Sequence, residues 1–219
     1  ENSRLQVRGI FTHFPSSDNT DARSNDRIRN HFLEHAGHIM ESLSLNRNDV
    51  LLHSANSYAL MLNPESHMDM VRPGLSFYGY FNNMAHKTQL SGQFPFKPVL
   101  KLIARPISVR RLPRGATISY GETARVSDDF QEVGVLPIGY ADGIPRSLSN
   151  GISFQGHPLL GRVTMDQIVL CGITSLNEGI ELLGDNSLPL EHWADLSNTI
   201  SYEIMVRLGE RIQRILCPV

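Results

Sequence analysis

The chain has 219 residues, of which 41% are hydrophobic and 19% are charged, and its formal net charge is −2 at pH 7. This balance is typical of a globular enzyme with one large or two smaller domains, and it gives no indication of nucleic-acid binding. No stretch approaches the roughly 20 apolar residues of a membrane span, and the first residues, ENSRLQVRG, lack the apolar core of a signal peptide. We therefore expect a cytoplasmic protein without a membrane partner.

The first 80 residues alternate between strand and helix patterns. A β-rich stretch at 5–14 is followed by a polar loop that offers capping residues, and then by a helix over 21–44 whose apolar residues recur every three or four positions. A strand at 49–56, a short helix at 57–63 and a strand at 67–79 complete this part. The order predicts α/β architecture with parallel strands.

After about residue 95 the pattern changes to short strands interrupted by glycine and proline, which is typical of a β-domain. Strands are expected within 99–113, 131–143, 151–173 and 179–184. A final helix over 197–216, capped by Ser197, closes the chain. We therefore place a domain boundary between residues 94 and 95.

Residues that often bind metals show no ligand pattern. Cys171 and Cys217 lie far apart in the sequence and are interpreted as reduced and structural. His31, His35 and His38 stand at helical spacing, which we interpret as a solvated helix face. No metal site is predicted.

Polar residues follow three successive strands of the α/β part. They are His13, then His53 with Asn56 and Ser57, and then Arg72 with Gly74. In parallel α/β proteins the carboxyl ends of strands line the ligand site. From these residues alone, an equally good interpretation is that His13 and His53 are hydrogen-bonded core residues and that Arg72 is a surface arginine.

Six motifs resemble, in order and spacing, those of bacterial alanine racemases, which are fold-type III pyridoxal phosphate (PLP) enzymes. The motifs are GIFTHFPSSD (9–18), LLHSANSYAL (51–60), VRPGLSFYG (71–79), ISYGET (118–123), PIGYADGIPR (137–146) and GRVTMDQ (161–167). The resemblance implies the second half of a PLP-binding (α/β)8 TIM-type barrel over 1–94 and a mainly β C-terminal domain over 95–219. It also implies interconversion of L- and D-alanine, which supplies D-alanine for peptidoglycan, in a head-to-tail homodimer that shares its active sites.

The lysine that binds PLP in this family is missing. It lies in a motif resembling VVKANAYGHG, whereas this chain contains only Lys87, Lys97 and Lys101, none in such a context. Four barrel strands cannot close alone, so we expect a C-terminal portion that is inactive without a lysine-bearing N-terminal segment. The alternative is a truncated paralogue that binds the cofactor but cannot catalyse.

By resemblance, Arg72 faces the pyridine nitrogen of PLP. A guanidinium can only donate a hydrogen bond, so the nitrogen stays largely unprotonated, which suits racemisation over transamination. Gly74 and Leu75 are expected to offer backbone N–H groups to the phosphate, and Ser57, next to Asn56, resembles the phosphate-contacting serine. His13 is assigned to both cofactor binding and catalysis.

Racemisation needs an acid–base group on each face of Cα. The resemblance assigns one role to the lysine and the other to Tyr120 of the opposite subunit, with His13 and Arg72 lowering the phenol's pKa. For the substrate it implies that the backbone N–H of Met165 binds the carboxylate and that Asp166 supports it.

Tyr140 is expected to line the access channel, together with Asp18 and Arg146. Such a narrow polar channel favours small amino acids, alanine above all. The family's C-terminal active-site tyrosine has no match where we expect it, since Glu210 and Ile212 stand there. Serine as a substrate therefore stays open.

Two other classes compete with a racemase. A non-catalytic PLP-binding barrel protein would not need the extended β-rich part that carries Tyr120 and Met165. The related barrel decarboxylases are expected to have a carboxylate at the pyridine position, where this chain has Arg72.

Overall fold

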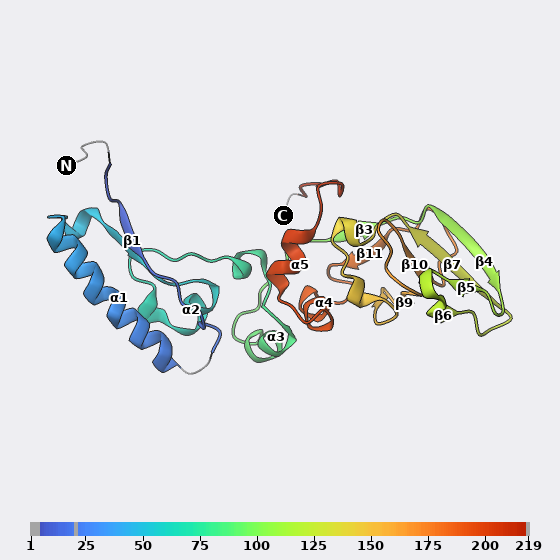
Figure 1. Ribbon diagram of the computed structural model, residues 1–219, viewed down its shortest axis with the longest axis horizontal. Coiled ribbons are helices and arrows are strands. Elements are labelled where there is room, and N and C mark those ends of the chain that lie inside the picture. The colour runs from blue at the N-terminus through green and yellow to red at the C-terminus, as the bar shows by residue number, and fades with distance from the viewer. Residues whose placement is uncertain (1–4, 20–21, 218–219) are drawn as a thin grey trace. The chain divides into compact units, whose positions relative to one another are not determined.

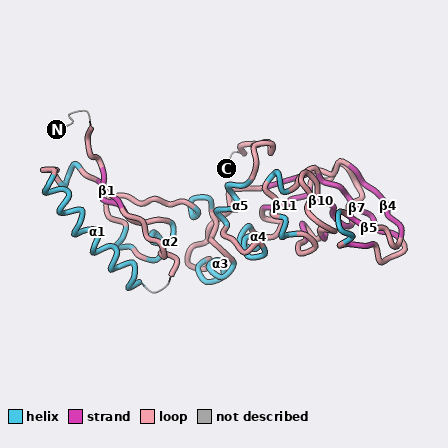
Figure 2. The backbone as a smooth tube through the Cα atoms, in the orientation of Figure 1, coloured by secondary structure: helices cyan, strands magenta, loops and turns pink. Residues whose placement is uncertain are grey.

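The computed structural model describes residues 5–19 and 22–217. The chain forms two compact units, residues 1–77 and 78–219, which we call the N-terminal and C-terminal units. Figure 1 labels most elements of each unit, and Figure 2 distinguishes helix, strand and loop along the same backbone. The domain boundary expected between residues 94 and 95 stays a prediction.

The N-terminal unit is built on one pair of parallel strands. Strand β1 (Gly9–Phe11) pairs with β2 (Leu51–His53), with Ile10 opposite Leu52. Helix α1 (Ala22–Ser42) connects the two strands, and helix α2 (Ser57–Leu62) follows β2 (Figure 1). This order confirms the predicted α/β arrangement, although both strands are shorter than expected.

Helix α1 packs through the apolar residues that predicted it. Phe32 and Ala36 are buried in one cluster with Val50, which directly precedes β2, and with Leu52 of β2. Residue 21, the first of the predicted helix, lies outside the described residues. The helix ends before residue 44 because Ser44 adopts a left-handed backbone, with φ of 50°, which closes the last turn.

The strand predicted over 67–79 is wrong. This segment is an irregular loop that ends in a 3-10 turn, Leu75–Tyr78. The N–H of Asp69 bonds to the Leu52 carbonyl at 3.1 Å and the N–H of Arg72 bonds to the Ala55 carbonyl at 2.8 Å. No continuous ladder forms there among the described residues. Pro73 supplies no N–H and the φ of Met68 is 51°, so the segment cannot keep a regular strand.

The C-terminal unit is mainly β, as predicted. Its largest sheet has three antiparallel strands in the order β10-β7-β4, and the other strands form two-stranded pairs. The strands are β3 (Leu102–Ala104), β4 (Ser108–Pro113), β5 (Thr117–Ile118), β6 (Ala124–Arg125), β7 (Phe130–Leu136), β8 (Ser153–Phe154), β9 (His157–Pro158), β10 (Ile168–Cys171) and β11 (Ile180–Leu183).

Three helices complete this unit: α3 (Met84–Leu90), α4 (Leu190–Leu196) and α5 (Ser201–Arg207). Trp193 of α4 is fully buried and meets the ring of Phe154 edge-on at 5.6 Å. The helix predicted over 197–216 is wrong in its bounds. Ser197 caps the C-terminus of α4, and α5 begins after Ile200 and ends at Arg207. Among the described residues, no helix has the length and apolarity needed to cross a membrane.

Candidate active site

In the N-terminal unit, the Arg72 guanidinium is held by uncharged groups. Its Nη1 lies 2.7 Å from Nδ1 of His53, and its Nη2 donates to the carbonyl oxygens of Thr12 at 2.8 Å and Ser54 at 3.4 Å. The guanidinium also lies over the ring of Phe11, 5.3 Å from its centroid. These contacts bring the ends of β1 and β2 and the 67–79 loop together around one cation.

The histidine that contacts Arg72 is His53. A guanidinium can only donate, so Nδ1 of His53 accepts the hydrogen bond. Burial lowers the pKa of His53, and the charge of Arg72 lowers it further, so the ring is neutral near pH 7. From the sequence we noted His53 at the end of its strand but gave the role beside Arg72 and Tyr120 to His13, so this contact of His53 is an addition to the predicted site. His13 itself is exposed, and its catalytic and cofactor-binding roles stay predictions.

A second cluster surrounds the buried hydroxyl of Ser57. Its Oγ accepts hydrogen bonds from the backbone N–H groups of Gly74 at 2.9 Å and Ser76 at 3.2 Å. The Oγ of Ser76 is buried and has no hydrogen-bond partner among the described residues. The N–H groups of Gly74 and Ser76 thus both point at the Ser57 hydroxyl, and the Ser76 hydroxyl lies in the same turn. The fully buried Leu75 lies in the same turn.

Asn56 has a structural task in this region. Its Oδ1 caps α2 by accepting from the N–H of Ala59 at 3.1 Å, and its Nδ2 donates to the Phe14 carbonyl at 3.4 Å. Among the residues predicted to bind a cofactor, Asn56, Ser57, Arg72, Gly74 and Leu75 thus lie at the end of β2 and on the loop bonded to it. Sequence reasoning missed Ser76, and it noted His53 without giving it a role.

In the C-terminal unit, Tyr120 lies on a tightly folded turn. Its side chain is 73% exposed. The neighbouring Ser119, with φ of 63°, donates through Oγ to the Arg162 carbonyl at 2.8 Å. Gly121 has φ of 72° and faces the guanidinium of Arg162 so closely that a Cβ there would lie 3.1 Å from Nη2. This left-handed backbone places Tyr120 beside the loop that leads to Met165.

The predicted substrate residues also lie on neighbouring turns. The N–H of Tyr140 donates to the Thr164 carbonyl, and the N–H of Ala141 donates to the Met165 carbonyl, both at 2.9 Å. Tyr140, Met165 and Asp166 are exposed. The C-terminal unit therefore joins the turns that carry Tyr120, Tyr140, Met165 and Asp166.

A buried carboxylate supports these turns. Asp142 is 2% exposed and accepts two hydrogen bonds from Arg211, from Nε to Oδ1 and from Nη2 to Oδ2, both at 2.8 Å. Burial alone would raise the pKa of this carboxyl, but the hydrogen bonds from Arg211 and from the Gly139 N–H leave it below its ordinary value. No sequence signal links Asp142 to Arg211, which lies 69 residues away.

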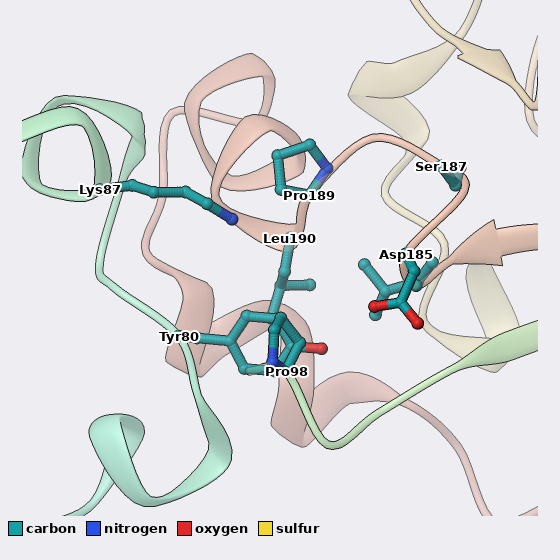
Figure 3. Close-up of a pocket in the computed structure, with 9 residues that line it drawn as sticks. Tyr80, Lys87, Pro98, Asp185, Ser187, Pro189 and Leu190 are labelled. Atoms are coloured by element: carbon teal, nitrogen blue, oxygen red, sulfur yellow. The ribbon is translucent and has the colours of Figure 1, made fainter. Parts of the chain in front are cut away.

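A cavity of about 290 Å³ in the C-terminal unit contains none of the predicted site residues (Figure 3). The OH of Tyr80 donates to the Leu100 carbonyl at 3.2 Å, Lys87 pairs with the buried Glu191 at 3.1 Å, and Asp185 pairs with Lys101 at 2.7 Å. Burial and the charge of Glu191 raise the pKa of Tyr80 above its ordinary value. With its polar groups already paired, this cavity is not a candidate for proton transfer.

Helix α1 also brings together His31, Glu34 and His35, whose ligand atoms lie within 4.8 Å of one another. All three side chains are exposed, and the two imidazole rings are 4.6 Å apart. Their exposure agrees with the interpretation of a solvated helix face, while the absence of a metal site stays a prediction.

Two family models match the chain. Residues 1–82 match the alanine racemase N-terminal domain, and residues 99–216 match the alanine racemase C-terminal domain. Among solved structures, the alanine racemase of Streptomyces coelicolor A3(2) is 32% identical with a TM-score of 0.83, and covers 96% of this chain. The alanine racemase of Streptomyces lavendulae is 30% identical with a TM-score of 0.84 and covers 98%. The chain covers 56% and 57% of these two proteins. These similarities confirm the predicted fold class, although the described residues form no closed barrel.

Curated relatives give the same result. The alanine racemase of Treponema pallidum is 34% identical over 96% of this chain, and that of Methanococcus maripaludis is 32% identical over 98%. The chain spans 58% of the length of each. With both family models matched in order and relatives of this similarity along nearly its whole length, the chain belongs to the alanine racemase family.

Proposed function

We propose that this chain supplies the cofactor-facing and substrate-facing residues of a PLP-dependent alanine racemase that interconverts L- and D-alanine. The surroundings of Arg72 carry the proposal. A permanent cation with a neutral histidine and two carbonyls as its described partners keeps its charge available for a ligand. The relatives are alanine racemases, and we propose the ring nitrogen of the cofactor PLP as that ligand.

The residues of the N-terminal unit fit PLP. The N–H groups of Gly74 and Ser76 converge on Ser57, and the unpartnered hydroxyl of Ser76 lies beside them, which suits a phosphate. Arg72 would donate to the ring nitrogen without protonating it. Bound PLP supplies an electron sink for the bond broken at the substrate's Cα. Leu75, Asn56 and His13 remain proposed cofactor-binding residues.

Tyr120 would hold and move the proton on one face of Cα. Phenols in general are weak acids, so a tyrosine acts as a base near neutrality only beside a positive charge. We propose that Tyr120 serves the site of the opposite subunit in a homodimer, and that the other proton is handled by a lysine from a further segment. His13 is retained as a group that orients the phenol.

The joined turns of the C-terminal unit would bind the substrate. The backbone N–H of Met165 donates to its carboxylate, with Asp166 in support, and Tyr140 restricts the space near Cα. A restricted pocket excludes large side chains, so alanine is the proposed substrate, and serine, whose side chain is larger by one hydroxyl group, would be a poorer one. The product D-alanine would serve peptidoglycan synthesis.

Two of the three lysines of this chain are paired with carboxylates, and none of the three lies in a KANAYGHG-like motif. Lys87 pairs with the buried Glu191, and Lys101 pairs with Asp185. We therefore expect the 219-residue chain alone to bind PLP poorly and to show no racemase activity. Joined to, or co-expressed with, a segment that contains a KANAYGHG-like motif, it should gain both.

Borohydride reduction followed by peptide mapping tests this proposal. The reduced pyridoxyl group should be found on the lysine of the added segment, and a segment with that lysine changed to alanine is the control. A pyridoxyl group on Lys87, Lys97 or Lys101 would refute the need for an added lysine. Loading with PLP but no exchange of the Cα proton in deuterated solvent would favour the non-catalytic alternative.

A further inference from the structure

The ion pair between Asp142 and Arg211 joins segments that are distant in the sequence. Arg211 follows α5 in the C-terminal segment, and Asp142 ends the 3-10 turn Tyr140–Asp142. Both Arg211 hydrogen bonds to the carboxylate measure 2.8 Å, and the Asp142 side chain is 3% exposed whereas that of Arg211 is 63% exposed. A two-point contact of this kind restrains both the distance and the orientation of the two groups.

Asp142 in turn restrains the turn that contains it. Its Oδ2 accepts from the Gly139 N–H at 2.9 Å, and its backbone carbonyl accepts from the Gly209 N–H at 2.9 Å. The carboxylate therefore closes the turn from inside, while the segment that carries Arg211 is tied to the same residue through its backbone. Movement of Arg211 would be transmitted to Tyr140.

The turn is also in direct contact with the proposed carboxylate-binding loop. Tyr140 and Ala141 donate to the carbonyls of Thr164 and Met165, as described above. A Cβ at Gly139 would lie only 2.3 Å from the Thr164 carbonyl oxygen and 2.5 Å from that of Met165. Because the two backbones touch without spare room, a displaced turn must displace Met165. The hydrogen bonds and the charge of Asp142 raise the pKa of Arg211, and the charge of Asp166 in this loop adds a smaller contribution.

We infer that Arg211 is a positioning residue that, through Asp142 and the Gly139–Ala141 backbone, fixes Tyr140 and the Met165 N–H for the substrate carboxylate. The inference rests on the proposed function for the identity of the substrate. The mechanical coupling between Arg211 and the two turns does not depend on the proposed function.

The test uses the complete racemase, that is, this chain together with its lysine-bearing segment. Arg211→Gln should reduce kcat/KM for alanine by on the order of 10²-fold, the cost of about 1 Å of misplacement. The loss should lie mainly in KM, since the carboxylate contact is made in ground and transition states alike. Arg211→Lys keeps a cation but not the planar two-point contact, so its kcat/KM should lie between those of the wild type and Arg211→Gln.

Arg214→Gln is the matched control. Arg214 lies three residues further on, and its guanidinium donates to the Leu208 and Gly209 carbonyls, so the variant loses one charge from the same segment. Its KM should stay within about twofold of the wild type, as expected of an exposed substitution away from the site. An equal rise in KM for Arg214→Gln would overturn the inference.

Hydrogen exchange provides a readout that does not depend on activity. In Arg211→Gln the amides of Tyr140 and Ala141 should exchange faster, whereas those of the β4–β7 ladder should not change. If the wild-type complete protein fails to racemise alanine, the proposed function fails, and the exchange result still decides whether Arg211 fixes the turn. Unchanged exchange at both amides would overturn the inference.

A double variant separates positioning from charge compensation. Asp142→Asn/Arg211→Gln removes the buried charge together with its partner. If Arg211 only neutralised Asp142, the double variant would recover the wild-type KM, which would overturn the inference. A KM that stays raised supports it, because the two-point restraint is absent in both variants.

Discussion

One arginine of each unit, Arg72 and Arg211, can be compared by its hydrogen-bond partners. In the N-terminal unit, the described partners of the Arg72 guanidinium are a neutral histidine ring and two backbone carbonyls. In the C-terminal unit, Arg211 makes a two-point ion pair with the buried carboxylate of Asp142. The same side chain is thus uncompensated in one place and neutralised in the other.

This difference separates a ligand-facing charge from a structural one. A carboxylate partner largely cancels the electric field of a guanidinium. Removing the arginine would leave the buried carboxylate as an unpaired charge, which is unfavourable. Arg72, held by dipoles and an aromatic face, keeps a net charge that an electron-rich ring nitrogen or an anion can use. The pattern favours cofactor binding in the N-terminal unit and positioning in the C-terminal unit.

The test with the largest expected effect asks whether Arg72 and Tyr120 in one active site come from the same subunit or from opposite subunits. In the complete racemase, Tyr120→Phe and Arg72→Glu should each lose activity, by about 10²–10⁴-fold for the loss of the general base. If Tyr120 serves the opposite subunit, a mixed dimer has one site with both changes and one with neither. Random reassociation of equal amounts should then restore roughly a quarter of wild-type activity in a two-fold dimer.

Subunit exchange must be verified by mass spectrometry, and each parent mixed with itself is the control. Activity equal to the sum of the parents, with mixed dimers present, would show that Arg72 and Tyr120 act within one subunit. In that case each active site would be formed by the two units of one subunit.

A smaller effect tests how closely the turns of the C-terminal unit are packed. Gly139→Ala places a Cβ 2.3 Å from the Thr164 carbonyl oxygen, so the Tyr140 turn and the Met165 loop must separate. We expect a loss of about 1–3 kcal/mol in the free energy of unfolding, the usual cost of overpacking. Denaturant titration measures it, together with faster exchange of the Tyr140 amide.

Gly92→Ala is the matched control, because a Cβ at Gly92 meets no atom within 4 Å. Its free energy of unfolding should change by no more than about 0.5 kcal/mol. Equal effects of the two substitutions would mean that the turns are not tightly coupled, and would weaken the role assigned to Asp142 and Arg211.

The smallest expected effect is on the pH dependence of stability, to which the partners of the two arginines contribute in different pH ranges. His53 has a lowered pKa in the folded state, so the unfolded chain binds more protons between that value and about 6.5, and stability falls as the pH drops through this window. The lowered pKa of Asp142 acts in the same direction, but in a window below about pH 4. Arg72→Gln should raise the pKa of His53 toward its ordinary value and leave the Asp142 window unchanged.

An NMR titration of the His53 ring measures this shift. Part of the lowering should persist in Arg72→Gln, because burial is its larger cause. Arg47→Gln, which removes an arginine paired with Asp69 in the same unit, should not move the His53 pKa. If the His53 pKa stays the same in Arg72→Gln, the arginine's charge does not reach the ring, and the contrast with Arg211 fails.

Local patterns predicted the elements whose stabilising contacts are close in the sequence. The apolar repeat of Phe32 and Ala36 predicted α1, and apolar runs flanking the helix predicted the parallel pair β1 and β2. Glycine and proline punctuation predicted the β-rich C-terminal unit. The six motifs predicted the family and the fold class, which the comparisons confirm. The roles of Tyr120, Met165, Asp166 and Tyr140 stay predictions.

By itself, then, the sequence determined the family, the helical and strand-rich regions, and the residue types available for chemistry, since these depend on local periodicity and on motifs. Only the tertiary structure decided that His53 contacts Arg72, that Ser76 joins the Ser57 cluster, and that Arg211 pairs with Asp142. It also decided that 67–79 is a loop and that α5 ends at Arg207. Each of these depends on contacts between residues distant in the chain or on backbone angles that a run of apolar residues does not reveal, so no local pattern could have specified them.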